Sequence, residues 1–207
     1  MATRVFSSIY QPRIGSSKVQ AHKLKVALAR YQIAAFVAHD DVEPSKEWQS
    51  EIESALRTMD ALIAMITPGF LESKWCDQEV GFALGRGKLV VSLRIDADPH
   101  GFLAKSQGLQ AKGLLPAAVA ERVLNILVQN SLSSARITES LVDRLVKSRS
   151  WESSRETLSW LEKSKRLNET QVARLMRALD ENPEVGYSTT VPERIRSLVA
   201  RSGTPAP

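Results

Sequence analysis

Short apolar runs of strand length alternate with helix-like segments through the first 130 residues, and this alternation is the strongest constraint on the fold. Four segments are typical of strands: 5–10, 33–38, 61–66 and 89–95. Four others have the 3.6-residue apolar period of a helix: 19–31, 46–59, 74–84 and 116–129. Residues 96–112 have neither pattern and are interpreted as a loop. This order predicts a parallel sheet with right-handed crossovers and helices on both faces, an α/β fold.

The predicted strands are continuously apolar, which indicates a sheet buried on both faces. In such sheets, ligands bind outside the carboxyl ends of the strands. The segments expected at that edge are 7–15, 39–45, 67–74 and the residues from 96 onward.

Residues 131–207 have a different character, because helical patterns follow one another with no strand-like run. One helix has a well-marked start, with Asn168 as N-cap, Gln171 three residues later and Leu167 placed to contact Val172. We predict four short helices in this part. The sequence therefore predicts an α/β domain at 1–130 and a small all-α module at 131–207.

Composition excludes several classes of function. The 28 Lys and Arg residues outnumber the 23 Asp and Glu residues, but they are interspersed rather than gathered on a basic face, so we expect no nucleic-acid partner. One cysteine and three scattered histidines predict no disulfide framework and no metal site. The apolar runs are too short to cross a bilayer. We expect a cytoplasmic protein that makes no contact with a membrane.

One stretch carries a more specific pattern than the rest. Trp75, Glu79 and Phe82 are spaced i, i+4 and i+7, so they share one face of a helix. A carboxylate flanked by two aromatic rings is partly desolvated, which raises the pKa of a carboxyl group. The alternative is that Glu79 is a surface residue whose neighbours happen to be large.

The order of several motifs matches a known family. These are 4–6 in the first strand, 35–44, 47–52, 55–56, 66–67 and the sequence Ser73-Lys74-Trp75-Cys76 followed by Glu79. Over residues 4–130 the chain resembles bacterial Toll/interleukin-1 receptor (TIR) domains. The resemblance implies a flavodoxin-like fold, and Trp75-x-x-x-Glu79 is similar to the signature of the NAD⁺-cleaving members.

The resemblance also implies roles for individual residues. Glu79 would be the catalytic residue, and Trp75 would pack near the nicotinamide. The residues after the first strand, together with the loop 39–45, would line the pocket: Ser7, Ser8, Tyr10 and Asp40. Asp40 has a second interpretation, as the start of a turn. Many bacterial members have a Ser-His or similar pair and an acidic residue after the first strand; this chain departs from that pattern, although Arg13 offers a phosphate partner.

The implied activity has a physical rationale. Breaking the nicotinamide–ribose bond passes through an oxocarbenium-like state, which a single carboxylate can stabilise. The resemblance thus implies an NAD⁺ nucleosidase or ADP-ribosyl cyclase of anti-phage immunity, with NAD⁺ as substrate and no separate cofactor. It also implies a homo-oligomer formed by TIR–TIR contacts, and the helical module offers a site for an effector or sensor protein. The alternative is a non-catalytic TIR adaptor.

Overall fold

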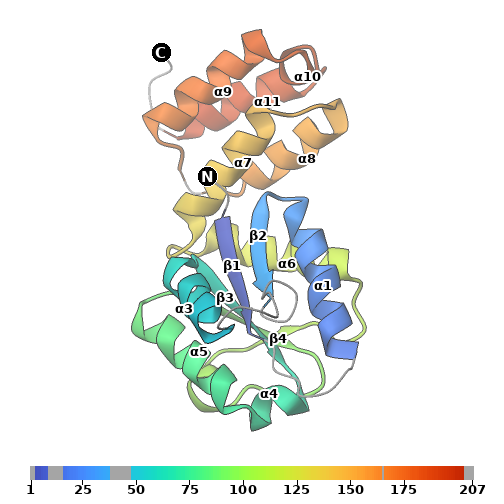
Figure 1. Cartoon of the computed structure of the whole chain (residues 1–207). Coiled ribbons are helices and arrows are strands. Elements are labelled where there is room, and N and C mark those ends of the chain that lie inside the picture. The colour runs from blue at the N-terminus through green and yellow to red at the C-terminus, as the bar shows by residue number, and fades with distance from the viewer. Residues whose placement is uncertain (1–2, 9–15, 38–47, 165, 203–207) are drawn as a thin grey trace. The chain divides into compact units, whose positions relative to one another are not determined.

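The backbone is described here for residues 3–8, 16–37, 48–164 and 166–202, from a computed structural model. Side chains are described for the same residues except 6–8, 16–18 and 48. The chain divides into two compact units, Thr3–Ile126 and a second that contains Leu127–Pro207 (Figure 1). The division falls inside helix α6 (Pro116–Gln129).

The first unit is built on a five-stranded, all-parallel sheet. The strands are β1 (Thr3–Ser8), β2 (Ile33–Val37), β3 (Ala61–Ile66), β4 (Leu89–Arg94) and β5 (Leu109–Gln110). Their order is β2-β1-β3-β4-β5. Strand β2 therefore lies on one side of β1, and β3, β4 and β5 follow in order on the other side. This is the flavodoxin-like arrangement, and it confirms the predicted α/β class with a helical region after it.

Helices cover the two faces of the sheet. On one face lie α3 (Trp48–Thr58), the short α4 (Pro68–Glu72) and α5 (Lys74–Gly85). On the other lie α1 (Ser16–Ala29) and the first turns of α6 (Figure 1). Alternate residues of β3 serve the two faces: Leu62, Ala64 and Ile66 belong to the core under α3 and α5, while Met65 faces α1 and α6.

The expected burial of the strands on both faces holds for β3 but is wrong for β2. All six residues of β3 are buried, because it is the central strand. In β2, Ala34 is exposed and Phe36 is half-buried. The reason is position: β2 is an edge strand, and its Ala34 and Phe36 line an open groove of about 510 Å³ beside α3.

Two short elements lie inside the segment 96–112 that was predicted to be a loop. They are the 3-10 turn η1 (Gly101–Lys105) and strand β5. Each is too short to show a periodic apolar pattern, so neither could be predicted from the amino-acid sequence. In the same way α4, a single turn capped by Thr67, was not predicted.

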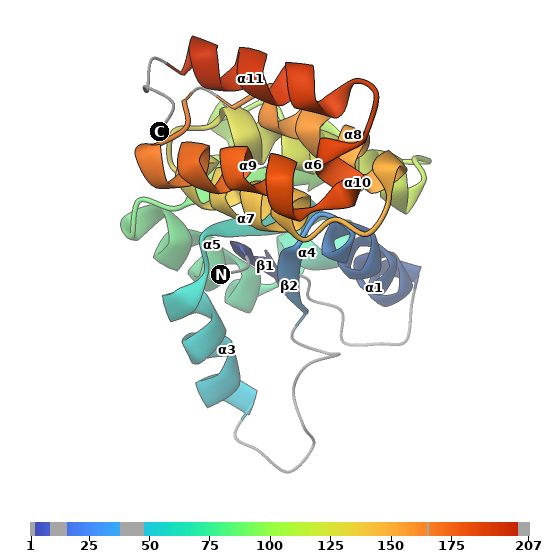
Figure 2. The same cartoon turned by 90° about the horizontal axis from the view of Figure 1, so that it is seen from above.

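The described part of the second unit consists of helices joined by short loops, with no strand (Figure 2). Its elements are α7 (Ser134–Val146), α8 (Trp151–Leu161), α9 (Glu169–Glu181), α10 (Pro183–Gly186) and α11 (Val191–Arg201). The capping box of Asn168 and Gln171 is present at the start of α9. The four-residue α10 was not predicted. The core consists of fully buried aliphatic side chains from every helix, among them Leu141, Leu158, Val172, Val185 and Ile195.

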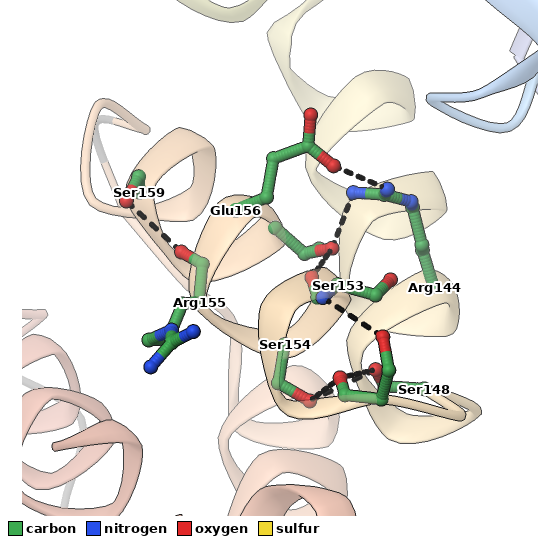
Figure 3. Close-up of polar contacts among 9 residues, drawn as sticks. Arg144, Ser148, Ser153, Ser154, Arg155, Glu156 and Ser159 are labelled. Carbon is green, nitrogen blue, oxygen red and sulfur yellow. Dashed lines mark hydrogen bonds and ion pairs between the residues drawn. The ribbon is translucent and has the colours of Figure 1, made fainter.

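Polar contacts between the helices surround this core. Figure 3 shows Arg144 of α7 reaching Glu156 of α8, with 2.7 Å between Nη2 and Oε2. The hydroxyl of Ser154 is fully buried, and it donates to the Glu184 carbonyl in α10 at 2.8 Å. Arg194 of α11 donates from Nε and Nη2 to the carboxylate of Glu162 at 2.9 and 2.7 Å. These contacts fix how α7, α8, α10 and α11 pack on one another.

The ion pair between Arg194 and Glu162 makes the stability of the helical unit depend on pH. Hydrogen bonds from Arg194 hold the pKa of Glu162 below its ordinary value; burial opposes this effect, and the charges of Arg194 and Arg201 add to it. The pair therefore stabilises the folded state fully above about pH 4.3, the ordinary glutamate pKa, and this contribution is lost as the pH falls through the lowered pKa. We predict that Arg194→Met lowers the free energy of unfolding at pH 7 by about 1 kcal/mol. Thermal unfolding of the whole chain measures this.

The matched control is Arg196→Met, on an exposed position of the same helix. The difference between wild type and Arg194→Met should shrink below pH 4, while Arg196→Met stays near wild type throughout. An Arg194→Met deficit that is the same at pH 7 and pH 3.5 would contradict the assigned role of the pair.

Candidate functional site

Helix α5 begins at the carboxyl edge of the sheet, where β3 ends. The side chain of Ser73 accepts a hydrogen bond from the Cys76 backbone N–H at 3.3 Å and caps the helix. Thr67 caps the preceding turn α4 in the same way, accepting from the Phe70 N–H at 3.2 Å. The two caps fix where α5 starts, and hence the direction of each of its side chains.

Two adjacent faces of α5 have different surroundings. Cys76, Val80 and Ala83 are buried in the core against β3 and α3. The neighbouring face, which carries Trp75 and Glu79, lines a groove beside α3. Because packing fixes the orientation of the buried face, the side chains of the neighbouring face must point into the groove.

This α3–α5 groove has a volume of about 320 Å³. One wall is formed by α5 and contains the predicted trio Trp75, Glu79 and Phe82, together with Gln78. The opposite wall is formed by α3 and contains Gln49, Ile52, Glu53, Leu56 and Arg57. The i, i+4, i+7 spacing thus brings the three side chains to one concave surface.

The carboxylate is much less exposed than the rings beside it. Glu79 is 7% exposed, against 39% for Trp75 and 36% for Phe82. The interpretation of Glu79 as an ordinary surface residue is therefore wrong. A carboxylate that is largely withdrawn from water can stabilise a nearby positive charge, because little water competes for it.

The groove is small for a whole dinucleotide. Small-molecule sites occupy roughly 300 to 1,000 Å³, so this groove lies near the lower limit. It has room for a nucleoside-sized part of a ligand.

On the α3 wall, Arg57 is paired with Glu53 at 3.5 Å, and both side chains are exposed.

The other predicted site residues are described only in part. Ser7 and Ser8 end strand β1, where they pair in register with Ile63 and Ala64 of β3, so their backbone lies at the carboxyl edge. Their side chains lie outside the described residues. Tyr10, Arg13 and Asp40, with the rest of the loop 39–45, also lie outside them.

A contact between His100 and Asp77, near the start of α5, was not predicted from the sequence. Nε2 of His100 lies 3.0 Å from the Asp77 carboxylate, and the imidazole packs edge-on against Phe70, with ring centroids 6.4 Å apart. The contact fastens the segment before η1 to α5. No periodic signal marks it, because the two residues lie in unrelated segments of the sequence.

Two other features, a metal-binding cluster and a membrane-spanning helix, are absent from the described residues. In the parts of the chain that the structure covers, no three His, Cys, Asp or Glu side chains are grouped so as to hold a metal ion. No helix within those same parts is long and apolar enough to cross a membrane.

Comparison with known proteins decides the family. A family model described as "TIR domain" matches residues 15–124, more than half of the 207-residue chain. The chain belongs to the TIR domain family. The match spans α1 to the first turns of α6 and includes the α3–α5 groove.

Among solved structures, this TIR protein is similar to the TIR domain of the Toll-related receptor TRR-2 from Hydra magnipapillata. The identity is 18%, the TM-score is 0.41, and the match covers 52% of this chain and 81% of the receptor domain. No curated protein matches the chain.

The cap of α5 gives a direct test of how the site is positioned. Ser73→Ala removes the acceptor for the Cys76 N–H at a position that is 3% exposed. We predict a loss of about 1 kcal/mol in the free energy of unfolding, measured by denaturant titration. Ser73→Thr, which keeps a hydroxyl, should recover most of it. Equal losses in the two variants would show that packing rather than capping fixes this position.

Proposed function

We propose that this TIR protein cleaves the nicotinamide–ribose bond of NAD⁺ in the cytoplasm, with Glu79 as the catalytic residue. The observation that carries the proposal is the placement of the Glu79 carboxylate, buried in a groove between the partly exposed rings of Trp75 and Phe82. NAD⁺ is the substrate, and the reaction needs no separate cofactor.

The cleavage reaction requires one well-placed anionic group. As the bond from ribose C1′ to nitrogen breaks, its electron pair leaves with nicotinamide, which becomes neutral and needs no acid. Positive charge develops on the ribose, and the Glu79 carboxylate stabilises it. A water molecule then adds to C1′, and its proton passes to the carboxylate and on to solvent. The products are nicotinamide and ADP-ribose.

The same intermediate has a second fate. If a nucleophile within the adenosine half reaches C1′ before water does, the product is a cyclic ADP-ribose. Both outcomes use Glu79 in the same way. In either case the reaction would act in anti-phage immunity, through its product as a signal or through the depletion of NAD⁺.

The size of the groove supports a role for assembly. About 320 Å³ accommodates the nicotinamide riboside half, with the ring beside Trp75, and leaves the adenosine half outside. We propose that a second copy of the chain, joined through TIR–TIR contacts, completes the site. The helical module would promote that assembly or receive an effector or sensor protein.

Replacing Glu79 tests the proposal. Glu79→Gln keeps the shape and removes the charge, so we expect kcat for NAD⁺ cleavage to fall by at least 100-fold, with an unchanged circular dichroism spectrum. The measurement is nicotinamide release by chromatography, at high protein concentration or with a crowding agent. The matched control is Glu72→Gln, an exposed glutamate of α4, which should keep full activity.

The rival hypothesis, a non-catalytic TIR adaptor, makes the opposite prediction. It expects no NAD⁺ turnover by assembled wild-type protein and no difference from Glu79→Gln. That pair of results would end the enzymatic proposal and favour the adaptor.

A further inference from the structure

A second cavity opens on the face of the sheet opposite to the α3–α5 groove. It lies between α1 and the start of α6, over the carboxyl halves of β3 and β4, and has a volume of about 270 Å³. We name it the α1–α6 pocket. All its described lining residues belong to the first unit.

The interior of the pocket is apolar. Six of the side chains that line it are buried, and every one of them is aliphatic or methionine: Leu24, Met65, Leu93, Ile95, Ala111 and Val119. Leu114 and Pro116 add two partly buried apolar groups. A cavity with this lining favours the apolar body of a ligand over water.

The polar groups of the pocket lie at its rim, on α1. They are the amide of Gln20 and the ammonium group of Lys23, both on exposed residues. Among the described lining residues, Lys23 is the single charged group, and no carboxylate faces it. The neighbouring Lys112, by contrast, is already paired with Asp96 at 3.1 Å. Among the described residues, the rim of the pocket therefore carries a positive charge with no carboxylate in the lining beside it.

Helix α6 adds to this charge. It begins at Pro116, which lines the pocket, and the backbone N–H groups of its first turn carry partial positive charge. The field at the mouth of the pocket thus favours an anion, while the interior favours hydrocarbon.

We propose that the α1–α6 pocket binds a small amphipathic anion of the medium-chain carboxylate class. The carboxylate pairs with Lys23 and accepts from the Gln20 amide, and the alkyl chain lies over Met65, Leu93 and Val119. At the packing density of protein interiors, about 0.74, the cavity takes about 200 Å³ of ligand atoms, or roughly a dozen heavy atoms. Decanoate has this size. The site is independent of Glu79 and of the proposed cleavage of NAD⁺.

The test is calorimetric titration of the whole chain with decanoate, with decanol as the neutral probe of the same length. We expect one decanoate per chain and weaker binding of decanol. Lys23→Glu should weaken decanoate binding by at least 10-fold and leave decanol unchanged. The matched charge reversal Lys105→Glu, at an exposed position of η1 outside the pocket, should change neither.

A filling substitution tests the location. Ala111→Leu adds volume inside the pocket and should weaken both probes, while thermal unfolding reports whether that variant is folded. The proposal is overturned if decanoate shows no saturable single-site binding. It is equally overturned if the Lys23→Glu variant binds decanoate as tightly as wild type does, since Lys23 would then not bind the carboxylate. If Ala111→Leu does not fold, the Lys23→Glu comparison decides.

Discussion

The constraint on which the site depends is the helical pitch of α5, because it places a packed face and a groove face side by side. Cys76, Val80 and Ala83 fill the core under α3, and this packing leaves Glu79 no direction other than the groove. The Glu79 side chain is buried, and the rings of Trp75 and Phe82 on the same face are partly exposed. A carboxylate withdrawn from water at this position is well suited to stabilising a cationic intermediate.

Much of the fold could be predicted because its long elements carry strong periodic signals. The six apolar residues 61–66 predicted the central strand β3, and the stripe of α9 with its Asn168 cap predicted that helix. The failures have a common cause. β5, α4 and α10 are too short to show a period. The exposure of Ala34 in β2 depends on the strand being at the edge, which local composition does not encode.

Some features of the candidate site could likewise be predicted from the sequence, and others could not. Trp75, Glu79 and Phe82 lie within eight residues on one helix, so their spacing alone predicted a shared face. The α3 wall of the groove, the Asp77–His100 pair and the α1–α6 pocket each join segments far apart in the chain. A single sequence carries no local signal for such contacts. The roles of Tyr10, Arg13 and Asp40 remain predictions from the family resemblance.

The most direct measurement is to locate bound NAD⁺. The Glu79→Gln protein, which should bind the dinucleotide without cleaving it, can be titrated with NAD⁺ while backbone amide resonances are followed by NMR. We expect saturable shifts concentrated on the facing walls of the groove, around Trp75, Phe82 and Ile52. Saturable shifts elsewhere, with the α3 and α5 resonances unmoved, would contradict the proposed site.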